Sequence, residues 1–118
     1  GTEATAFNAR AVLALQKNGF QITKTTESSN PVYAVQAGPA MSVQKQYSKK
    51  YESSMGTGEK FVAIMTCDHA DQNCPFIPEA LARISMNFVD PGKSDGTAQE
   101  AAIYLERSRE TEYRPLDL

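Results

Sequence analysis

The chain has no tryptophan, no long apolar run and only two cysteines. A membrane-spanning helix needs about 20 consecutive apolar residues, so we expect no such helix, and no signal peptide is visible. Two cysteines are too few for the disulfide framework that holds small secreted proteins together. These absences favour a cytoplasmic protein.

The chain also lacks a strong charge of either sign. Its 118 residues include 12 basic and 14 acidic side chains, which give a net charge of -2. This balance provides no attraction to nucleic acid or to an anionic membrane, and we expect neither as a partner. The composition, 41% hydrophobic and 22% charged, is that of one folded domain spanning residues 1–118.

Two helices are predicted near the ends of the chain. Asn8 is a suitable N-cap for a helix from about Ala9 to Asn18, which Gly19 would end. Thr97 and Glu100 have the spacing of a capping box, which opens a second helix. That helix runs to about residue 112, and its predicted core stripe is Ala98, Ala101, Ala102 and Leu105.

The segment between these helices predicts strands of two kinds. Residues 23–30 are polar and indicate a loop. Pro31–Ala37 and Met41–Tyr47 alternate in part between apolar and polar residues, and Gly38 with Pro39 supplies a turn, so a β-hairpin is expected. This hairpin offers an edge for association, and we predict a homodimer.

Phe61–Met65 is apolar without interruption. Such a short run is typical of a strand covered on both faces, as in the parallel sheet of an α/β protein. Ile84, Met86 and Phe88 alternate with other residues and predict a further strand that ends at Asp90. The expected fold is therefore α/β, a small and partly parallel sheet with flanking helices and an inserted hairpin.

Cys67 and Asp90 each follow one of these predicted core strands. The carboxyl ends of parallel strands line the ligand crevice of an α/β sheet, so both side chains can approach one pocket. Asp90 precedes Pro91, which biases it toward extended geometry and suits a general acid. The other interpretation is a common Asp-Pro-Gly turn that ends the strand.

Cys67 and Cys74 form a pair of thiols in one polar segment. In a continuous helix their Cα atoms would lie about 10 Å apart, whereas a disulfide needs roughly 4.4–6.8 Å. A redox pair therefore requires a looped or unwinding segment. The alternative is two reduced structural thiols.

His69 lies between the two cysteines, but the spacing of these three residues matches no usual zinc finger and no fourth ligand is evident. We therefore predict no metal and no cofactor.

These residues resemble the low-molecular-weight tyrosine phosphatase family, especially its thioredoxin-coupled arsenate reductase branch. The specific part of the resemblance is the Cys-x6-Cys-Pro segment. The matching segments are Gly1-Thr2-Glu3, Asn8-Ala9-Arg10-Ala11-Val12, Gly19-Phe20, Ala63-Ile64-Met65-Thr66-Cys67, Asp71-x-Asn73-Cys74-Pro75-x-Ile77-Pro78, Asp90-Pro91, Glu100-Ala101-Ala102 and Glu106-Arg107-Ser108-Arg109.

The resemblance implies a relay of three thiols. Cys67 matches the thiol that displaces arsenite and forms a disulfide with a first cysteine. Cys74 matches the thiol that resolves this disulfide and presents the Cys67–Cys74 pair to a thioredoxin-like reductant. Asp90 matches the acid that protonates the leaving oxygen in the phosphatase reaction.

The family's nucleophile loop, Cys-x5-Arg, is absent from these 118 residues, because position 73, six after Cys67, is an asparagine. Without that loop, no backbone cradle would hold a tetrahedral oxyanion. We therefore expect a truncated phosphatase-like fold that is inactive alone but retains the redox pair. The alternatives are a non-catalytic binding or assembly protein with structural thiols, and a fragment of an active full-length arsenate reductase.

Overall fold

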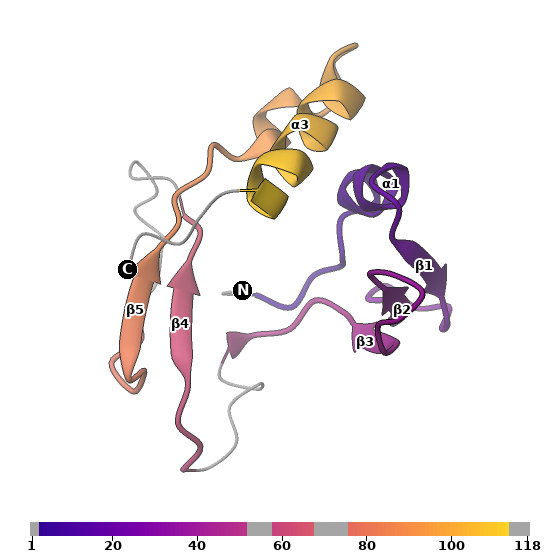
Figure 1. Cartoon of the computed structure of the whole chain (residues 1–118). Helices are drawn as coiled ribbons and strands as arrows, with labels where there is room; N and C mark the ends of the chain where they lie inside the picture. The colour runs from indigo at the N-terminus through magenta and orange to yellow at the C-terminus, as the bar shows by residue number, and fades with distance from the viewer. Residues whose placement is uncertain (1–2, 52–57, 68–75, 114–118) are drawn as a thin grey trace.

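The computed structural model describes residues 3–51, 58–67 and 76–113 (Figure 1). These residues form a mixed α/β structure with two α-helices, one short 3₁₀ helix and two small sheets. The elements in chain order are α1 (Ala9–Lys17), β1 (Gln21–Lys24), β2 (Tyr33–Gln36), β3 (Gln44–Gln46), β4 (Val62–Met65), β5 (Ala82–Ser85), η1 (Pro91–Ser94) and α3 (Glu100–Tyr113).

Helix α1 begins and ends as its sequence predicts. The Asn8 side chain accepts a hydrogen bond from the Arg10 amide at 2.9 Å, which satisfies a free donor of the first turn. Gly19 follows the helix with a φ of 96°, a left-handed conformation that glycine adopts without steric cost. The helix buries Val12 and Ala14.

Strands β1, β2 and β3 form one antiparallel sheet, here called sheet A. The predicted hairpin is confirmed as β2 and β3, and the amide of Met41 donates to the carbonyl of Gly38 in its connection. The prediction of a loop over residues 23–30 is wrong at its start, because β1 runs to Lys24, which pairs with Tyr33. This polar edge strand depends on its partner strand rather than on its own composition.

Sheet A has one face of mixed polarity and one mostly polar face. Val35 pairs with both Ile22 and Gln44, and directly paired side chains lie on the same face. Phe7 packs edge-on against Tyr33 on this face, with 5.5 Å between the ring centroids. The first face also carries the polar side chains of Lys24 and Gln46. The opposite face carries Gln21, Thr23, Ala34, Gln36 and Lys45.

Strands β4 and β5 form a two-stranded parallel sheet, here called sheet B. The parallel pairing is as predicted. Strand β5 begins and ends earlier than expected, at Ala82 and Ser85, although the Met86 amide still donates to the Met65 carbonyl at 2.8 Å. The chain then leaves the sheet toward η1.

The expectation that β4 is covered on both faces is wrong. Ala63 is buried and packs with Ile77 and Ala80 in a small cluster. Val62 and Ile64, which alternate with it, are 50% and 52% exposed. The run is apolar throughout, yet among the described residues only one of its two faces is covered.

Helix α3 packs against α1 through a face other than the predicted one. Tyr104 is the buried residue of α3, and Ala98, Ala101 and Ala102 are exposed. The alanine stripe was therefore a wrong choice of core. Polar and aromatic groups fix the helix pair instead, for example the bond from Asn18 Nδ2 to Ser108 Oγ at 2.8 Å.

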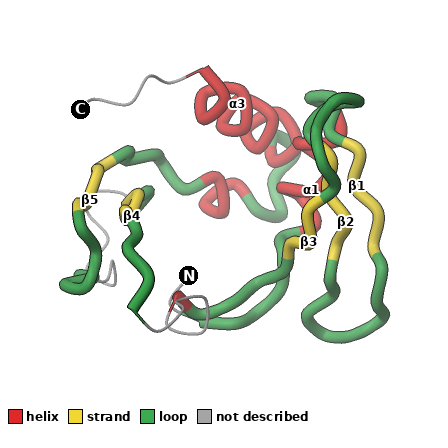
Figure 2. Tube along the Cα trace, turned by 60° about the horizontal axis from the view of Figure 1, so that its bottom comes forward, coloured by secondary structure: helices red, strands yellow, loops and turns green. Residues whose placement is uncertain are grey.

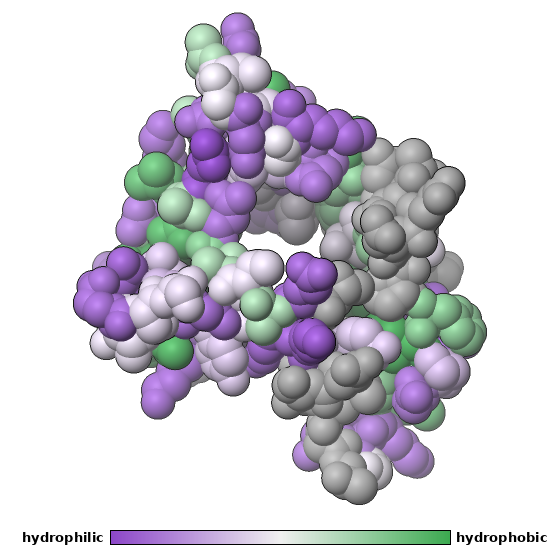
Figure 3. All heavy atoms as spheres, turned by 180° about the vertical axis from the view of Figure 1, so that it is seen from behind, coloured by the Kyte–Doolittle hydropathy of each residue, from purple (hydrophilic) through white to green (hydrophobic). Residues whose placement is uncertain are grey.

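The two sheets lie on opposite sides of the described structure, with the helices on the side of sheet A (Figures 1 and 2). Among the described elements, no strand of sheet A contacts a strand of sheet B. A space-filling view shows an opening between the two halves (Figure 3). Among the described residues, therefore, neither sheet covers the other.

Candidate functional site

Cys67 directly follows the end of the parallel ladder. The Thr66 carbonyl accepts from the Phe88 amide at 3.4 Å, and Cys67 is the next residue. It is half-buried and disulfide-bonded. Cys74, the other cysteine of the chain, lies outside the described residues. The sulfur of Cys67 thus belongs to the second residue after the end of β4 at Met65.

Asp90 lies beyond the same end of sheet B, two residues after Phe88. Its Oδ1 accepts a hydrogen bond from the Gly92 amide at 2.8 Å and caps η1, which starts with Pro91. This is the turn that the alternative interpretation describes. Cys67 follows β4 closely, whereas Asp90 comes five residues after Ser85, the last residue of β5, and not directly at a strand end as predicted. The catalytic roles of both residues stay predictions.

The segment after Asp90 leads into a charged cluster that the sequence did not indicate. Arg10 on α1 donates through Nε to Glu100 Oε2 at 2.7 Å, and its NH1 lies 3.5 Å from Asp95 Oδ2. Glu100 also accepts from the Gly96 amide at 2.8 Å. Its carboxylate therefore closes the turn before α3 and binds α1.

Tyr104 connects the same cluster to the start of α1. Its hydroxyl donates to Asp95 Oδ1 at 2.8 Å and accepts from Asn8 Nδ2 at 3.2 Å. Only 6% of Tyr104 is exposed, and a buried hydroxyl with two partners fixes its neighbours. No local sequence signal joins these residues, since they lie up to 96 positions apart.

The electrostatics of the cluster are those of a structural ion pair. The Gly96 amide, and then Arg10, lower the pKa of the Glu100 carboxyl. The bond to Glu100, followed by the charge of Asp95, raises the pKa of Arg10. Burial, and then the bond to Asp95, raise the pKa of Tyr104. All three shifts favour the forms present at neutral pH.

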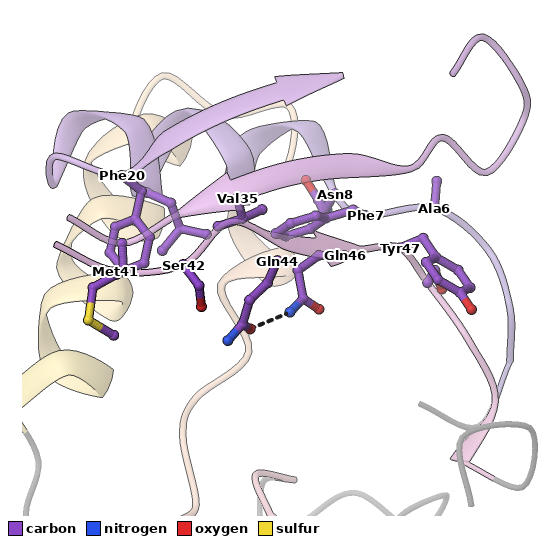
Figure 4. A pocket seen from close by; sticks show the side chains of 13 residues that line it. Ala6, Phe7, Asn8, Phe20, Val35, Met41, Ser42, Gln44, Gln46 and Tyr47 are labelled. Atoms are coloured by element: carbon purple, nitrogen blue, oxygen red, sulfur yellow. Dashed lines mark hydrogen bonds between the residues drawn. The ribbon is translucent and has the colours of Figure 1, made fainter. Parts of the chain in front are cut away.

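A pocket of about 530 Å³ lies over the face of sheet A that carries Val35. Figure 4 shows Phe20, Val35 and Met41 in its wall, with Gln46 Nε2 donating to Gln44 Oε1 at 3.3 Å. Neither Cys67 nor Asp90 lines this pocket. Its lining residues are Ala6, Phe7, Asn8, Leu15, Phe20, Val35, Ala37, Met41, Ser42, Gln44, Gln46, Tyr47 and Ser48.

A second pocket, of about 320 Å³, lies between α1 and α3. Its wall includes Leu15, Phe20, Tyr104 and Arg107. The Nε of Arg107 is buried and has no hydrogen-bond partner, while its guanidinium pairs with Glu110 through NH1. Because that Nε is inaccessible, it offers no contact to a ligand in the pocket.

Within residues 3–51, 58–67 and 76–113, no three His, Cys, Asp or Glu side chains gather in a way that could hold a metal ion. His69 lies outside these ranges. None of the described helices has the length and apolar character needed to cross a membrane.

Comparison with known proteins adds no relative. No family model, curated protein or solved structure matches this chain.

Proposed function

We propose that this chain is a relative of thioredoxin-coupled arsenate reductases and low-molecular-weight tyrosine phosphatases that works as a thiol–disulfide couple. The couple consists of Cys67 and Cys74. The observation that carries the proposal is the disulfide-bonded state of Cys67 at the carboxyl end of a parallel strand. The assignment to the family rests on the resemblance of the sequence alone.

The proposed reaction is exchange with a dithiol reductant of the thioredoxin class. A thiolate of the reductant attacks one sulfur of the disulfide, forms a mixed disulfide and releases the other sulfur as a thiolate. The second thiol of the reductant then breaks the mixed disulfide. The chain gains two thiols, and the reductant becomes a disulfide, so two electrons and two protons are transferred.

The proposal gives Asp90 no part in this exchange. Its carboxylate caps η1 through Gly92, and no Cys-x5-Arg loop occurs in the chain to present an oxyanion to it. We therefore expect no turnover of p-nitrophenyl phosphate and no reduction of arsenate by these 118 residues. Turnover of either substrate would contradict the proposal.

Thiol titration in denaturant tests the couple. We expect no titratable thiol in the oxidised chain, and two per chain after incubation with thioredoxin, its reductase and NADPH. The variants Cys67→Ser and Cys74→Ser are matched controls that each retain one thiol and should consume no NADPH. A disulfide that thioredoxin leaves intact under native conditions would refute the couple.

A second candidate is a binding or assembly protein in which the sulfur pair is structural. The partial burial of Cys67 favours this candidate, because a shielded sulfur is less accessible to an external thiolate. It predicts a disulfide that withstands thioredoxin and whose chemical reduction lowers the unfolding midpoint. A redox couple suits the reducing cytoplasm, whereas a permanent disulfide suits an oxidising compartment.

A further inference from the structure

The four edge strands of the two sheets differ in charge. Strands β1 and β3 form the edges of sheet A, and β4 and β5 form the edges of sheet B. Three of the four contain a basic residue, namely Lys24 in β1, Lys45 in β3 and Arg83 in β5. Strand β4 contains none, and residues 61–66 include no charge and no proline. A charged residue on an edge strand opposes pairing with another chain. Among these four edges, only β4 lacks such a residue.

The open face of sheet B is apolar as well. Val62 pairs with Ala82 and Ile64 with Ile84, and paired side chains share a face. Arg83 is paired with Ala63 and so lies on the other face. Parallel sheets are normally covered on both faces and rarely consist of two strands alone. The described part of sheet B is therefore incomplete at its β4 edge.

We propose that the β4 edge pairs with β4 of a second copy of this chain. The edge has to be matched by a strand that is extended, apolar and uncharged, and β4 itself meets these conditions. Sheet A does not contact sheet B, so its strands do not occupy this edge. The sequence suggested the hairpin edge β3 for association, but β3 contains Lys45, whose charge opposes pairing with a second strand.

The symmetry of a dimer sets the register of the pairing. A two-fold axis perpendicular to the sheet makes the two strands antiparallel and keeps each face on its own side. Paired residues must then belong to the same face. With the axis at Ala63, Val62 lies opposite the partner's Ile64, and the four exposed side chains form one apolar patch.

The assembly stops at two copies. After pairing, the combined sheet has the order β5, β4, the partner's β4 and the partner's β5. Both outer strands contain Arg83, whose charge opposes further strand addition. The arrangement is therefore a closed dimer rather than a fibre.

Light scattering coupled to size exclusion tests the dimer. The wild-type chain should elute at twice the 12.9 kDa of one copy. Ile64→Lys places a charge in the pairing strand and should give the mass of a single copy. Thr23→Lys adds the same charge on the polar face of β1 and should leave the dimer intact. Circular dichroism checks that both variants fold.

If Ile64→Lys fails to fold, hydrogen exchange of the wild-type chain tests the proposed pairing of β4. The backbone amides of β4 should exchange more slowly as the protein concentration rises, whereas those of β3 should not change. A monomeric wild-type chain would overturn the proposal. So would a dimer that persists in folded Ile64→Lys, or protection that rises at β3 and not at β4.

Discussion

The guanidinium of Arg10 donates to the carboxylate of Glu100 at 2.7 Å. This bond joins α1 to α3. Because Glu100 also accepts from the Gly96 amide, one carboxylate holds both the helix pair and the turn that precedes α3. The relationship sets how the fold responds to acid.

Protonation of Glu100 should destabilise the fold. Its pKa is lowered in the folded state from the ordinary 4.5, first by the Gly96 amide and then by Arg10. The stabilisation is therefore complete above the ordinary pKa and is lost as the pH falls through the lower folded pKa. We expect Glu100→Gln to lower the thermal midpoint at neutral pH and to converge with wild type in acid. Glu106→Gln, an exposed change on the same helix, is the control. A gap between Glu100→Gln and wild type that stays constant in acid would contradict this role.

Removal of the Tyr104 hydroxyl should have a modest cost. Tyr104→Phe keeps the buried ring but loses the bonds to Asp95 and Asn8. We expect a loss of about 1 kcal/mol in the free energy of unfolding, measured by urea denaturation. Tyr113→Phe, at a side chain that is 77% exposed, should have no effect. Equal effects of the two changes would show that the bonds contribute nothing.

The cluster beneath β4 depends on Ile77. This side chain is 9% exposed and packs with Ala63 and Ala80. Ile77→Ala should lower the free energy of unfolding by about 2–4 kcal/mol, because it leaves a cavity. Leu81→Ala removes a side chain that is 67% exposed and should cost far less. If the order of the two losses were reversed, the assignment of this core would be wrong.

The end of α1 requires a left-handed residue at Gly19. Its φ is 96°, and no atom lies within 4 Å of an added Cβ, so the backbone conformation alone opposes a side chain. We expect Gly19→Ala to lower the free energy of unfolding by about 1 kcal/mol. Gly38→Ala, where φ is not positive and the nearest atom is 3.8 Å away, should be nearly neutral. A neutral Gly19→Ala would contradict the capping role.

Local signals in the sequence predicted the helix ends and the hairpin. The Asn8 cap and the Gly19 stop each act within a few residues, so a single sequence reveals them. Strand β1 was missed because its polar residues become a strand only through pairing with β2, for example Lys24 with Tyr33. The core face of α3 was also assigned wrongly because it depends on a distant segment: α3 turns Tyr104 toward α1, where the hydroxyl bonds to Asn8.

The candidate site was predictable to the extent that strand direction determines it. The parallel pairing of β4 and β5 was predicted, but Asp90 comes five residues after the end of β5 at Ser85. The pairing of Arg10 with Glu100 joins residues 90 positions apart, so no local spacing or periodicity in the sequence predicts it. The exposure of Val62 and Ile64 was equally hidden, because composition shows that a strand is apolar and not what lies against it.

The contact between α1 and α3 has a consequence for synthesis. The ribosome releases α1 before α3, so the face of α1 that packs on α3 stays uncovered while the strands between the two helices are made. Strands β1 to β3 can form a hairpin-based sheet earlier, since their pairing spans fewer residues. The nascent chain thus presents an apolar helix face to chaperones until α3 has been made.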